Sequence, residues 1–393
     1  MARTLHIPDY VQELKGEAAF AVLARVEELE RKGRNIVHME IGQPDFKTPS
    51  PIVDAALESL RRGDHGYAPT LGIRELREAI AKRESRKRGA EVSWQNVAIM
   101  PGGKMAIFVA MSATLEAGDE VIYPDPGFPT YGNVTNYLQC IPKMLPLVES
   151  RNFSFDREVF VQLISPKTRM IILNSPNNPT GGVIPADDLR FVAEYARKNG
   201  IWIISDEIYD ELSFGEERTP SIWDLPDVRQ QSIVLNSFSK TFAMAGWRLG
   251  YAIVPDQLIS AISVLSVNLF GCTATFTQHA GIVAASLSNE VIYMRSQYLE
   301  RRNYLVDALN KIKGVSCCMP EGAFYAFPNV SSFGRKSSEI AEKLLVDFGV
   351  AVLPGTAFGE HGEGYLRLSY ATSMENIREA VKRISKGLDS LRI

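Results

Sequence analysis

Short apolar runs alternate with helix-like segments through the middle of the chain. Near-continuous runs rich in β-branched residues occur at 97–100, 120–123, 170–173, 201–204, 232–235 and 249–254. Such runs are typical of strands buried on both faces, as in a parallel sheet covered by helices. Between them, 104–116 is helix-like and 187–198 has the spacing of an amphipathic helix. The middle of the chain is therefore predicted to form an α/β domain with a mostly parallel sheet.

The two ends of the chain have a different pattern. Residues 1–50 contain an arm and an extended piece at 38–46, and a long polar helix pattern starts near residue 285. Shorter strand-like runs follow at 323–327 and 365–370. This pattern suggests a smaller α+β domain built from both ends. The predicted division is an N-terminal arm with part of the small domain at 1–50, a large domain at 51–284 and a C-terminal small domain at 285–393.

Composition and charge narrow the class of protein. The chain has 393 residues, is 45% hydrophobic and carries a net charge of -3, which is ordinary for a globular enzyme and gives no reason to expect nucleic acid or an anionic membrane as a partner. No run of about 18 apolar residues occurs, so no membrane span is expected. Four cysteines without C-x-x-C spacing indicate neither a disulfide framework nor a metal site. With no signal-peptide pattern in the first 30 residues, a reduced, cytoplasmic setting is expected.

Polar and glycine residues collect just after the predicted strands, where open α/β sheets bind their ligands. Gly102-Gly103-Lys104 lies between a predicted strand and a predicted helix, so its backbone N–H groups could approach an anion. A plain tight turn explains these glycines equally well. Neither the G-x-x-x-x-G-K-[ST] nor the G-x-G-x-x-G spacing is present, so neither a Walker loop nor a nicotinamide site is indicated.

Two further positions carry candidate chemistry. Asp206 follows a buried apolar strand, where a carboxylate needs a cationic partner such as a protonated pyridine nitrogen, although a helix N-cap is an alternative. Tyr209 could reach the same ligand. Lys240, beside Ser237 and Ser239, is a candidate Schiff-base nucleophile if it is partly desolvated.

Arg248 could join the two serines in receiving a phosphate, because its planar guanidinium gives a two-pronged contact. Taken alone, a surface lysine at 240 and a structural arginine at 248 would be the simpler interpretation. The loop at 174–182 contains two prolines and two glycines, and its rigidity would hold Asn178 in one orientation as a hydrogen-bond donor. An ordinary turn between strand and helix is the alternative there.

Four motifs occur in order: Asn-Asn-Pro-Thr-Gly at 177–181, Ser-Asp-Glu-Ile-Tyr at 205–209, Ser-Phe-Ser-Lys at 237–240 and Gly-Trp-Arg-Leu-Gly at 246–250. With them the sequence resembles the class I/II aminotransferases, enzymes of fold type I in the aspartate aminotransferase superfamily that use pyridoxal 5'-phosphate (PLP). The resemblance runs from about Gly42 to Arg367. It implies a large domain with a mostly parallel seven-stranded sheet between helices, plus a smaller α+β domain.

The resemblance also implies roles for the cofactor-binding residues. Lys240 would attach the cofactor covalently and carry a proton, and Asp206 would pair with the pyridinium nitrogen. Asn178 and Tyr209 would hydrogen-bond the phenolic oxygen. The phosphate would be bound by Ser237, Ser239, Arg248 and the backbone N–H groups of Gly103 and Lys104. Phe128 would stack on the ring, and Tyr67 would reach the phosphate of a neighbouring subunit, which predicts a homodimer with shared sites. Without the motifs, Phe128 and Tyr67 would be read as core aromatics.

At the substrate end, Arg367 would grip the α-carboxylate of the amino acid, helped by Asn178 and the backbone of Gly42. A surface ion pair and a simple turn are the alternatives for Arg367 and Gly42. Members specific for aspartate use an arginine from the second subunit, yet 268–276 contains none. Phe270 and Phe276 in that segment, with Tyr131 elsewhere, could instead line a pocket that accepts apolar or aromatic side chains.

The resemblance thus predicts an aminotransferase that moves the amino group of an L-amino acid to a 2-oxo acid, expected to be 2-oxoglutarate, with a broad or apolar-tolerant donor range in which aspartate stays open. A PLP-dependent C–S lyase on the same fold is the alternative that the sequence does not separate. A non-catalytic PLP-binding regulator is a remote alternative, since such regulators carry an additional DNA-binding domain before a region like this one.

Overall fold

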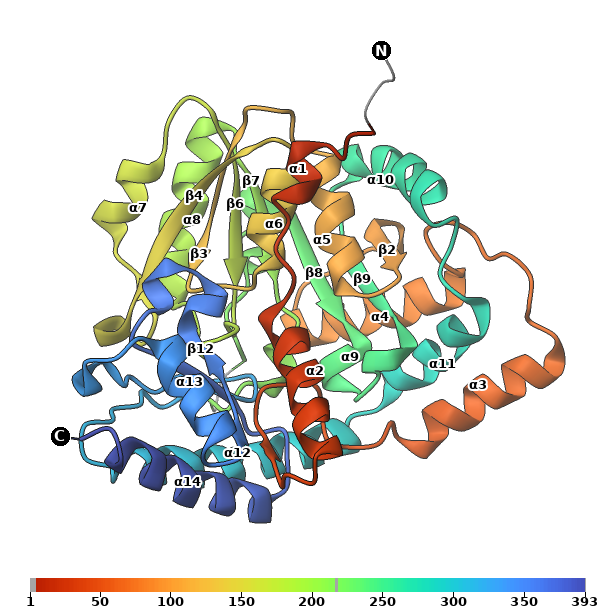
Figure 1. Cartoon of the computed structure of the whole chain (residues 1–393). Coiled ribbons are helices and arrows are strands. Elements are labelled where there is room, and N and C mark those ends of the chain that lie inside the picture. The colour runs from red at the N-terminus through yellow and green to blue at the C-terminus, as the bar shows by residue number, and fades with distance from the viewer. Residues whose placement is uncertain (1–4, 216–217, 393) are drawn as a thin grey trace.

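The computed structural model describes residues 5–215 and 218–392. Its centre is a large sheet with the strand order β2-β9-β8-β7-β6-β3-β4-β5, flanked by helices on both faces (Figure 1). The strands of this sheet are β2 (Val97–Met100), β3 (Glu120–Asp125), β4 (Ile141–Val148), β5 (Ser154–Phe155), β6 (Thr168–Asn174), β7 (Trp202–Asp206), β8 (Ser232–Ser237) and β9 (Gly250–Ile253). Neighbours from β8 to β4 pair in parallel, whereas β9 is antiparallel to β2 and β8.

The mostly parallel sheet predicted for the middle of the chain is confirmed, but its strand count is eight rather than seven. The additional strand is the two-residue β5, which pairs antiparallel with β4 at the edge. β4 itself was not among the apolar runs read from the sequence, because Pro142 and Pro146 interrupt it. Proline cannot donate to a ladder and is tolerated mainly near sheet edges, which is where β4 lies.

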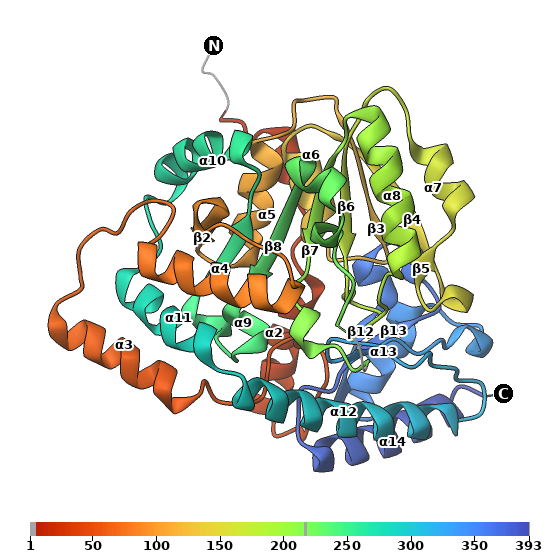
Figure 2. The ribbon, with the colours of Figure 1, turned by 180° about the vertical axis from the view of Figure 1, so that it is seen from behind.

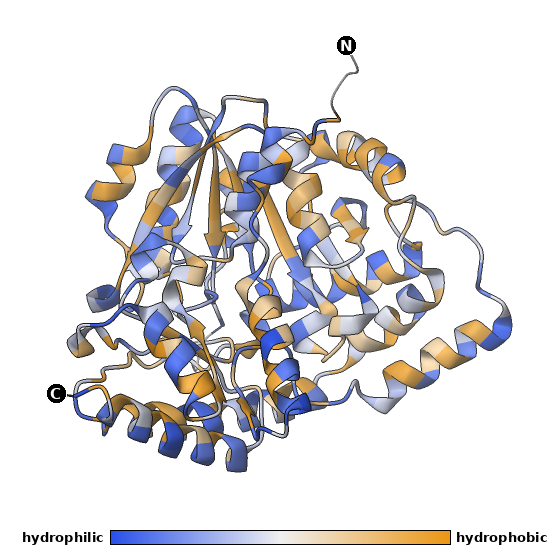
Figure 3. Cartoon of the chain, in the orientation of Figure 1, coloured by the Kyte–Doolittle hydropathy of each residue, from blue (hydrophilic) through white to orange (hydrophobic). Residues whose placement is uncertain are grey.

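Successive residues of the central strands pack into different cores on the two faces of the sheet. Ile171 and Ile203 belong to the core beneath α4 and α8, whereas Ile172 and Ile204 belong to the core beneath α5 and α6. Figures 1 and 2 show these two helix layers from opposite sides, and Figure 3 shows the apolar strands enclosed between them. This burial on both faces explains the unbroken apolar runs in the sequence.

The helices of the chain differ widely in length. They are α1 (Asp9–Gln12), α2 (Ala18–Arg31), α3 (Ser50–Arg62), α4 (Arg74–Arg88), α5 (Gly103–Ser112), α6 (Thr130–Tyr137), α7 (Arg157–Leu163), α8 (Ala186–Asn199), α9 (Phe238–Thr241), α10 (Asp256–Leu269), α11 (Thr275–Ser286), α12 (Asn289–Asn310), α13 (Ser337–Val346) and α14 (Met374–Asp389). Among the described residues, none of them combines the length and apolar character needed to cross a bilayer.

A second, smaller unit contains strands from both ends of the chain. β1 (Val37–His38) pairs in parallel with β11 (Val350–Ala351), and a three-stranded antiparallel sheet has the order β10-β13-β12. Its strands are β10 (Tyr325–Ala326), β12 (Leu353–Pro354) and β13 (Leu366–Ser369). Residues of α12, α13 and α14 pack with these strands in a separate core, which Tyr209 and Leu212 also join. The boundaries at 50/51 and 284/285 stay a prediction.

The N-terminal arm connects the two units. The backbone N–H of Lys15 donates to Asn133 Oδ1 at 3.1 Å, and Asn133 Nδ2 donates back to the carbonyl of Lys15 at 2.9 Å, which fixes the arm on α6. Further on, Val26 and Leu29 of α2 pack against Leu345 of the smaller unit. The residues between these two anchors, 16–25, therefore cross from one unit to the other.

Candidate active site

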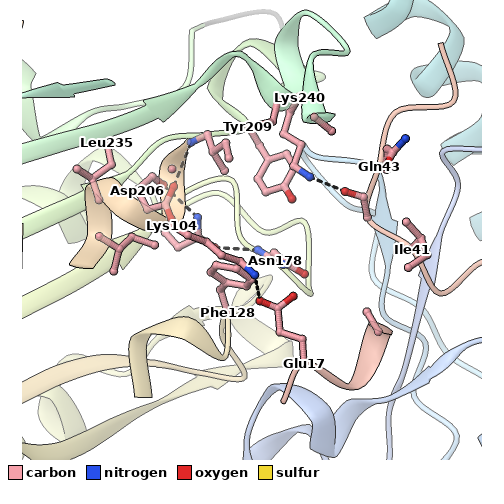
Figure 4. Close-up of a pocket in the computed structure, with 18 of the residues that line it drawn as sticks. Glu17, Ile41, Gln43, Lys104, Phe128, Asn178, Asp206, Tyr209, Leu235 and Lys240 are labelled. Carbon is pink, nitrogen blue, oxygen red and sulfur yellow. Dashed lines mark hydrogen bonds and ion pairs between the residues drawn. The ribbon is translucent and has the colours of Figure 1, made fainter. Parts of the chain in front are cut away.

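A cavity of about 480 Å³ lies where the carboxyl ends of the central strands meet the smaller unit and the N-terminal arm (Figure 4). This volume is in the range of cofactor and substrate sites. Most of the site residues predicted from the sequence line it, namely Gly42, Gly103, Lys104, Phe128, Asn178, Asp206, Tyr209, Ser239, Lys240, Arg248 and Arg367. Segments separated by more than 300 residues in the sequence thus meet in one place.

Asp206 is the last residue of β7, and its carboxylate is buried at the floor of the cavity. It accepts hydrogen bonds from the Tyr131 hydroxyl at 2.7 Å and from the backbone N–H of Ile208 at 3.3 Å. Burial raises the pKa of Asp206 to about 6 despite these bonds, which lower it. The next helical turn starts only at Asp210, so the helix N-cap alternative does not apply. A cation placed beside Asp206 would offset the cost of burying its charge.

Lys240 lies in the short helix α9, directly after β8, and its Nζ donates to the backbone carbonyl of Gly42. Burial, together with the positive charges of Arg367 and Arg248, lowers the pKa of Lys240 to about 8. About a tenth of its amine is then neutral at pH 7, far more than for an ordinary lysine, and the neutral amine is the form that a nucleophilic lysine requires. The surface-lysine alternative is therefore wrong.

An anion cradle, formed by the N-terminus of α5, Ser239 and Arg248, also lines the cavity. Helix α5 begins at Gly103, and its first N–H groups have the positive end of the helix dipole behind them. A Cβ on Gly102, whose φ is +87°, would lie 2.2 Å from Arg248 Nη2, so only glycine lets the guanidinium approach the helix. Ser239 lines the cavity, and Ser237 lies behind it, donating to Ser239 Oγ at 2.9 Å.

Helix N–H groups, a hydroxyl and a guanidinium form the donor set that a phosphate group requires. Together with a desolvated lysine and a buried carboxylate, this cradle fits the ring and the phosphate of PLP. No cluster of histidine, cysteine and acidic side chains suited to a metal ion occurs among the described residues.

Arg367, in β13, is buried, and no carboxylate among the described residues pairs with it. Its Nη1 donates to Asn178 Oδ1 at 3.3 Å and its Nη2 donates to the backbone carbonyl of Glu40, while its Nε has no hydrogen-bond partner. The rings of Tyr325 and Phe358 lie 4.5 and 4.8 Å from the guanidinium carbon and hold its plane. The surface ion-pair alternative is wrong, and a buried arginine with a free N–H is suited to bind a carboxylate.

Comparison with known proteins agrees with this geometry. Residues 34–384 match the family model "Aminotransferase class I and II". The chain belongs to this family. An aspartate aminotransferase from Pyrococcus horikoshii is 40% identical over 91% of this chain and 92% of the relative. A probable aspartate/prephenate aminotransferase from Aquifex aeolicus is 36% identical over 97% of this chain and 98% of its own length.

Solved structures give the same result. The aspartate aminotransferase from Thermus thermophilus with maleate superposes with a TM-score of 0.92 at 35% identity, covering 98% of this chain and 100% of that one. Members of this family use pyridoxal phosphate, and the protein is a PLP-dependent aminotransferase. The fold type I assignment made from the four motifs is confirmed.

Some predicted residues of the aminotransferase do not line the cavity. Tyr67 is 99% exposed on the protein surface. Phe270 and Phe276 line a neighbouring cavity beside Trp247 in the same chain, and their contribution to a substrate pocket, expected from the segment that relatives supply across subunits, stays a prediction. Tyr131, in contrast, lines the active-site cavity and is fully buried there.

Several residues of the cavity were missed by the sequence analysis, Glu17 and Tyr325 among them. Glu17, on the N-terminal arm, forms an ion pair with Lys104 Nζ across the cavity (Figure 4). The hydroxyl of Tyr325 lies 2.8 Å from that of Tyr209, and a Cβ on Gly42 would lie 2.1 Å from the Tyr325 hydroxyl. Tyr325 belongs to an apolar run that indicated only a strand, and a single acidic residue in an arm gives no signal at all.

Proposed function

We propose that this aminotransferase transfers the amino group of L-amino acids with apolar or aromatic side chains to 2-oxoglutarate, and that aspartate is a further donor. The observation that carries the proposal is the buried Arg367 with its unpartnered Nε, which shares one cavity with Lys240 and Asp206. A carboxylate bound there would present its α-carbon to the lysine that also carries the cofactor.

The cofactor-binding roles follow from the chemistry of each side chain. When bound, PLP supplies an electron sink for the charge left on the α-carbon. Lys240 holds the cofactor and moves the proton, because its amine has a lowered pKa. Asp206 holds a positive charge on the ring nitrogen, and Asn178 and Tyr209 donate to the phenolic oxygen. Phe128 packs on the ring face.

The phosphate and the substrate are proposed to bind at opposite ends of the cavity. The N–H groups of Gly103 and Lys104, with Ser237, Ser239 and Arg248, bind the phosphate. At the substrate end, Arg367 forms a planar fork for the α-carboxylate, which Asn178 and the backbone of Gly42 assist.

The proposed donor range is supported by the apolar part of the cavity lining. Phe20, Ile41, Ile107, Phe128 and Tyr325 line the cavity, and Tyr325 packs directly on Arg367. Lys104 is already neutralised by Glu17. A donor with an uncharged side chain leaves that ion pair intact, whereas the second carboxylate of 2-oxoglutarate or aspartate would compete with Glu17 for Lys104.

Aspartate is retained as a donor because relatives in Pyrococcus horikoshii and Thermus thermophilus are named aspartate aminotransferases. Another solved structure, at 35% identity and a TM-score of 0.88, is named an aromatic aminotransferase from Pyrococcus horikoshii and covers 93% of this chain. The two names support a donor range that includes both acidic and aromatic side chains. In the proposed pocket, Lys104 pairs with a substrate carboxylate when there is one and with Glu17 when there is none.

A homodimer with shared active sites is part of the proposal. Tyr67 is an almost fully exposed aromatic residue, and Leu57, Val264 and Val267 are also exposed large apolar side chains. Mixing Tyr67→Phe chains with Lys240→Ala chains tests the sharing. If each site uses Tyr67 of the partner subunit, the mixed dimer has one doubly altered site and one intact site, so activity reappears on mixing.

We also propose a cytoplasmic location. It is supported by the four cysteines, all of which are free thiols in the described structure.

A half-reaction screen tests the proposed function. The purified holoenzyme is mixed with each of the twenty amino acids in turn, and the visible band of the cofactor is followed. Apolar and aromatic amino acids are expected to shift the band fastest, and the band should return when 2-oxoglutarate is added. Pyruvate released from cystathionine without any 2-oxo acid would instead indicate a C–S lyase, and a protein that binds no PLP would contradict both.

A further inference from the structure

A buried ion network lies directly behind the turn that carries Asp206 and Tyr209. These two residues line the cavity, whereas Glu207 and Asp210, next to them in the sequence, contact side chains of helix α4. The turn therefore has a catalytic face and a charged face. The charged face is not used by any step of the proposed chemistry.

Arg88 is the centre of the network on the side of Glu207. Its Nη2 donates to Glu207 Oε2 at 2.7 Å, its Nε donates to Glu84 Oε2 at 2.8 Å, and its Nη1 donates to the hydroxyl of Ser221. Ser221 in turn donates to the second oxygen of Glu207. The side chains of Arg88, Glu84 and Glu207 are each at most 3% exposed, so these bonds are shielded from water.

Lys87 makes the corresponding contacts on the side of Asp210. Its Nζ donates to Glu84 Oε1 at 2.6 Å and to Asp210 Oδ2 at 2.5 Å. The other oxygen of Asp210 accepts a hydrogen bond of 3.1 Å from Asn236 Nδ2, and Asn236 lines the active-site cavity. A continuous series of contacts thus runs from α4 to the wall of the site. Burial opposes ionisation of Glu84, but Lys87 and Arg88 lower its pKa to about 2, so the carboxylate is charged.

This arrangement costs free energy that an apolar interior would not. Three charged groups are buried and two more, Lys87 and Asp210, are partly buried beside them, and well-packed apolar residues often stabilise a fold as much or more. What an ion network adds is fixed geometry, because each bond has a defined direction. Residues 207–209 belong to neither β7 nor the helical turn Asp210–Leu212, and the only backbone bond that ties Glu207 to another element in the described structure is the one to Leu235, so the side-chain network adds to the support of the turn.

We propose that Lys87 and Arg88 are positioning residues, which hold the turn from behind so that Asp206 and Tyr209 face the cofactor. The inference rests on the cofactor-binding roles proposed for Asp206 and Tyr209. Supporting partners of this kind commonly change ligand affinity by 10- to 100-fold when they are removed from metal sites, and a comparable loss is expected here.

Three variants test the inference: Lys87→Met, Asp210→Asn and the double variant, which removes the same contact without changing the net charge. Each is expected to weaken PLP binding to the apoprotein about tenfold and to move the pH midpoint of the cofactor's visible band. Lys87→Arg keeps a cation that can reach both acids and should restore most of the affinity. If the three variants fold and bind PLP with wild-type affinity and an unchanged midpoint, the network has only a structural role and the inference is wrong.

Two further variants separate the possible causes. Arg157→Met removes a cation from the buried Asp188, which does not line the cavity, and it is expected to lower stability without affecting PLP binding. If it weakens PLP binding as much as Lys87→Met does, general destabilisation explains the effect and the inference fails. Asp206→Asn tests the underlying role: should it bind PLP normally, the role proposed for Asp206 is wrong and the inference falls with it.

A milder variant applies if Lys87→Met does not fold. Tyr251→Phe removes one neutral hydrogen bond of 2.6 Å to Glu84 and no charge. It is expected to weaken PLP binding about threefold, in line with the net contribution of one hydrogen bond. Wild-type affinity in this variant would overturn the inference.

Discussion

The two walls of the cavity differ in how completely their polar groups are satisfied. On the cofactor wall, formed by Asp206, Tyr209, Ser239 and Lys240, the first and third have partners inside the fold, while Tyr209 and Lys240 bond across the cavity to Tyr325 and Gly42. The Tyr131 hydroxyl holds Asp206, and Ser237 holds Ser239. In the substrate wall, formed by Glu17, Gly42, Tyr325 and Arg367, the Nε of Arg367 has no partner within 5–215 and 218–392.

This difference agrees with what each wall has to bind. A cofactor that stays in place is best served by groups that are already oriented, because no reorganisation is then needed at the moment of reaction. A substrate that comes and goes is best served by groups with free hydrogen-bonding capacity and by an ion pair that can be exchanged. Arg367 Nε offers the first, and the half-exposed pair between Lys104 and Glu17 offers the second.

The largest effect is expected on the cofactor wall. Lys240→Ala removes both the covalent attachment and the proton carrier, so turnover should fall roughly 10⁴-fold or more. The half-reaction with a good donor, followed at the visible band, measures the loss. Lys311→Ala, at the exposed residue that caps the C-terminus of α12, is the control and should leave the rate unchanged. Substantial turnover by Lys240→Ala would contradict the role of this residue.

Much of the cofactor wall could be predicted from the sequence, because its residues directly follow buried strands. Asp206 and Ser237 come two residues after the apolar runs 201–204 and 232–235, and the carboxyl ends of parallel strands meet at one edge of the sheet. The substrate wall could not be derived in this way. Glu17 and Tyr325 are 308 positions apart, and only the path of the arm and the docking of the smaller unit bring them to the same cavity.

For Arg367 too, only part of the answer could be read from the sequence. The resemblance to the family indicated its role, but not its surroundings. The packing of its guanidinium against Tyr325 and Phe358 depends on how the smaller unit folds. In the same way, the prolines of β4 hid a strand whose neighbours, rather than its own pattern, place it in the sheet.

On the substrate wall, Arg367→Lys should weaken substrate binding while the cofactor wall stays intact. A lysine keeps the positive charge but loses the planar fork, so kcat/KM for donor and acceptor should fall about 100-fold. The visible band of the resting enzyme should not change. Arg302→Lys is a matched control, since Arg302 also lies over an aromatic ring, that of Phe214, but outside the cavity. Loss of the cofactor band in Arg367→Lys would show that the two walls are not separable.

The desolvated lysine of the cofactor wall should also be visible in the stability of the apoprotein. The pKa of Lys240 is about 8 in the folded chain and near 10.5 for an ordinary lysine. Below pH 8 both states hold the proton, so the folded state carries the full cost of the buried ammonium. Between pH 8 and 10.5 only the unfolded state binds the proton, so stability rises with pH, and above pH 10.5 the cost is gone.

Lys240→Met should therefore raise the unfolding free energy of the apoprotein by ~2 kcal/mol at pH 7, with the difference from wild type vanishing near pH 10.5. Urea unfolding of both chains across this pH range measures it. The partial exposure of Lys240 limits the expected size to less than full burial would give. A difference that stays constant with pH would mean that packing, rather than charge, causes the gain.

The smallest effect is expected at Glu17, and it tests whether a substrate carboxylate displaces Glu17 from Lys104 on the substrate wall. If the carboxylate of Glu17 occupies Lys104 in competition with the second carboxylate of 2-oxoglutarate, Glu17→Gln should lower the KM for this acceptor. Ion pairs exposed to this degree contribute about 0.2–1 kcal/mol, so a change of about threefold is expected. The KM for an aromatic donor should change less, because an uncharged side chain does not need Lys104.

Glu13→Gln, on the same arm but exposed and outside the cavity, is the control. Higher salt should reduce the difference between Glu17→Gln and wild type, since it screens a half-exposed pair. An equal fall in KM for both substrates would instead mean that Glu17 restricts entry to the cavity and does not select by charge.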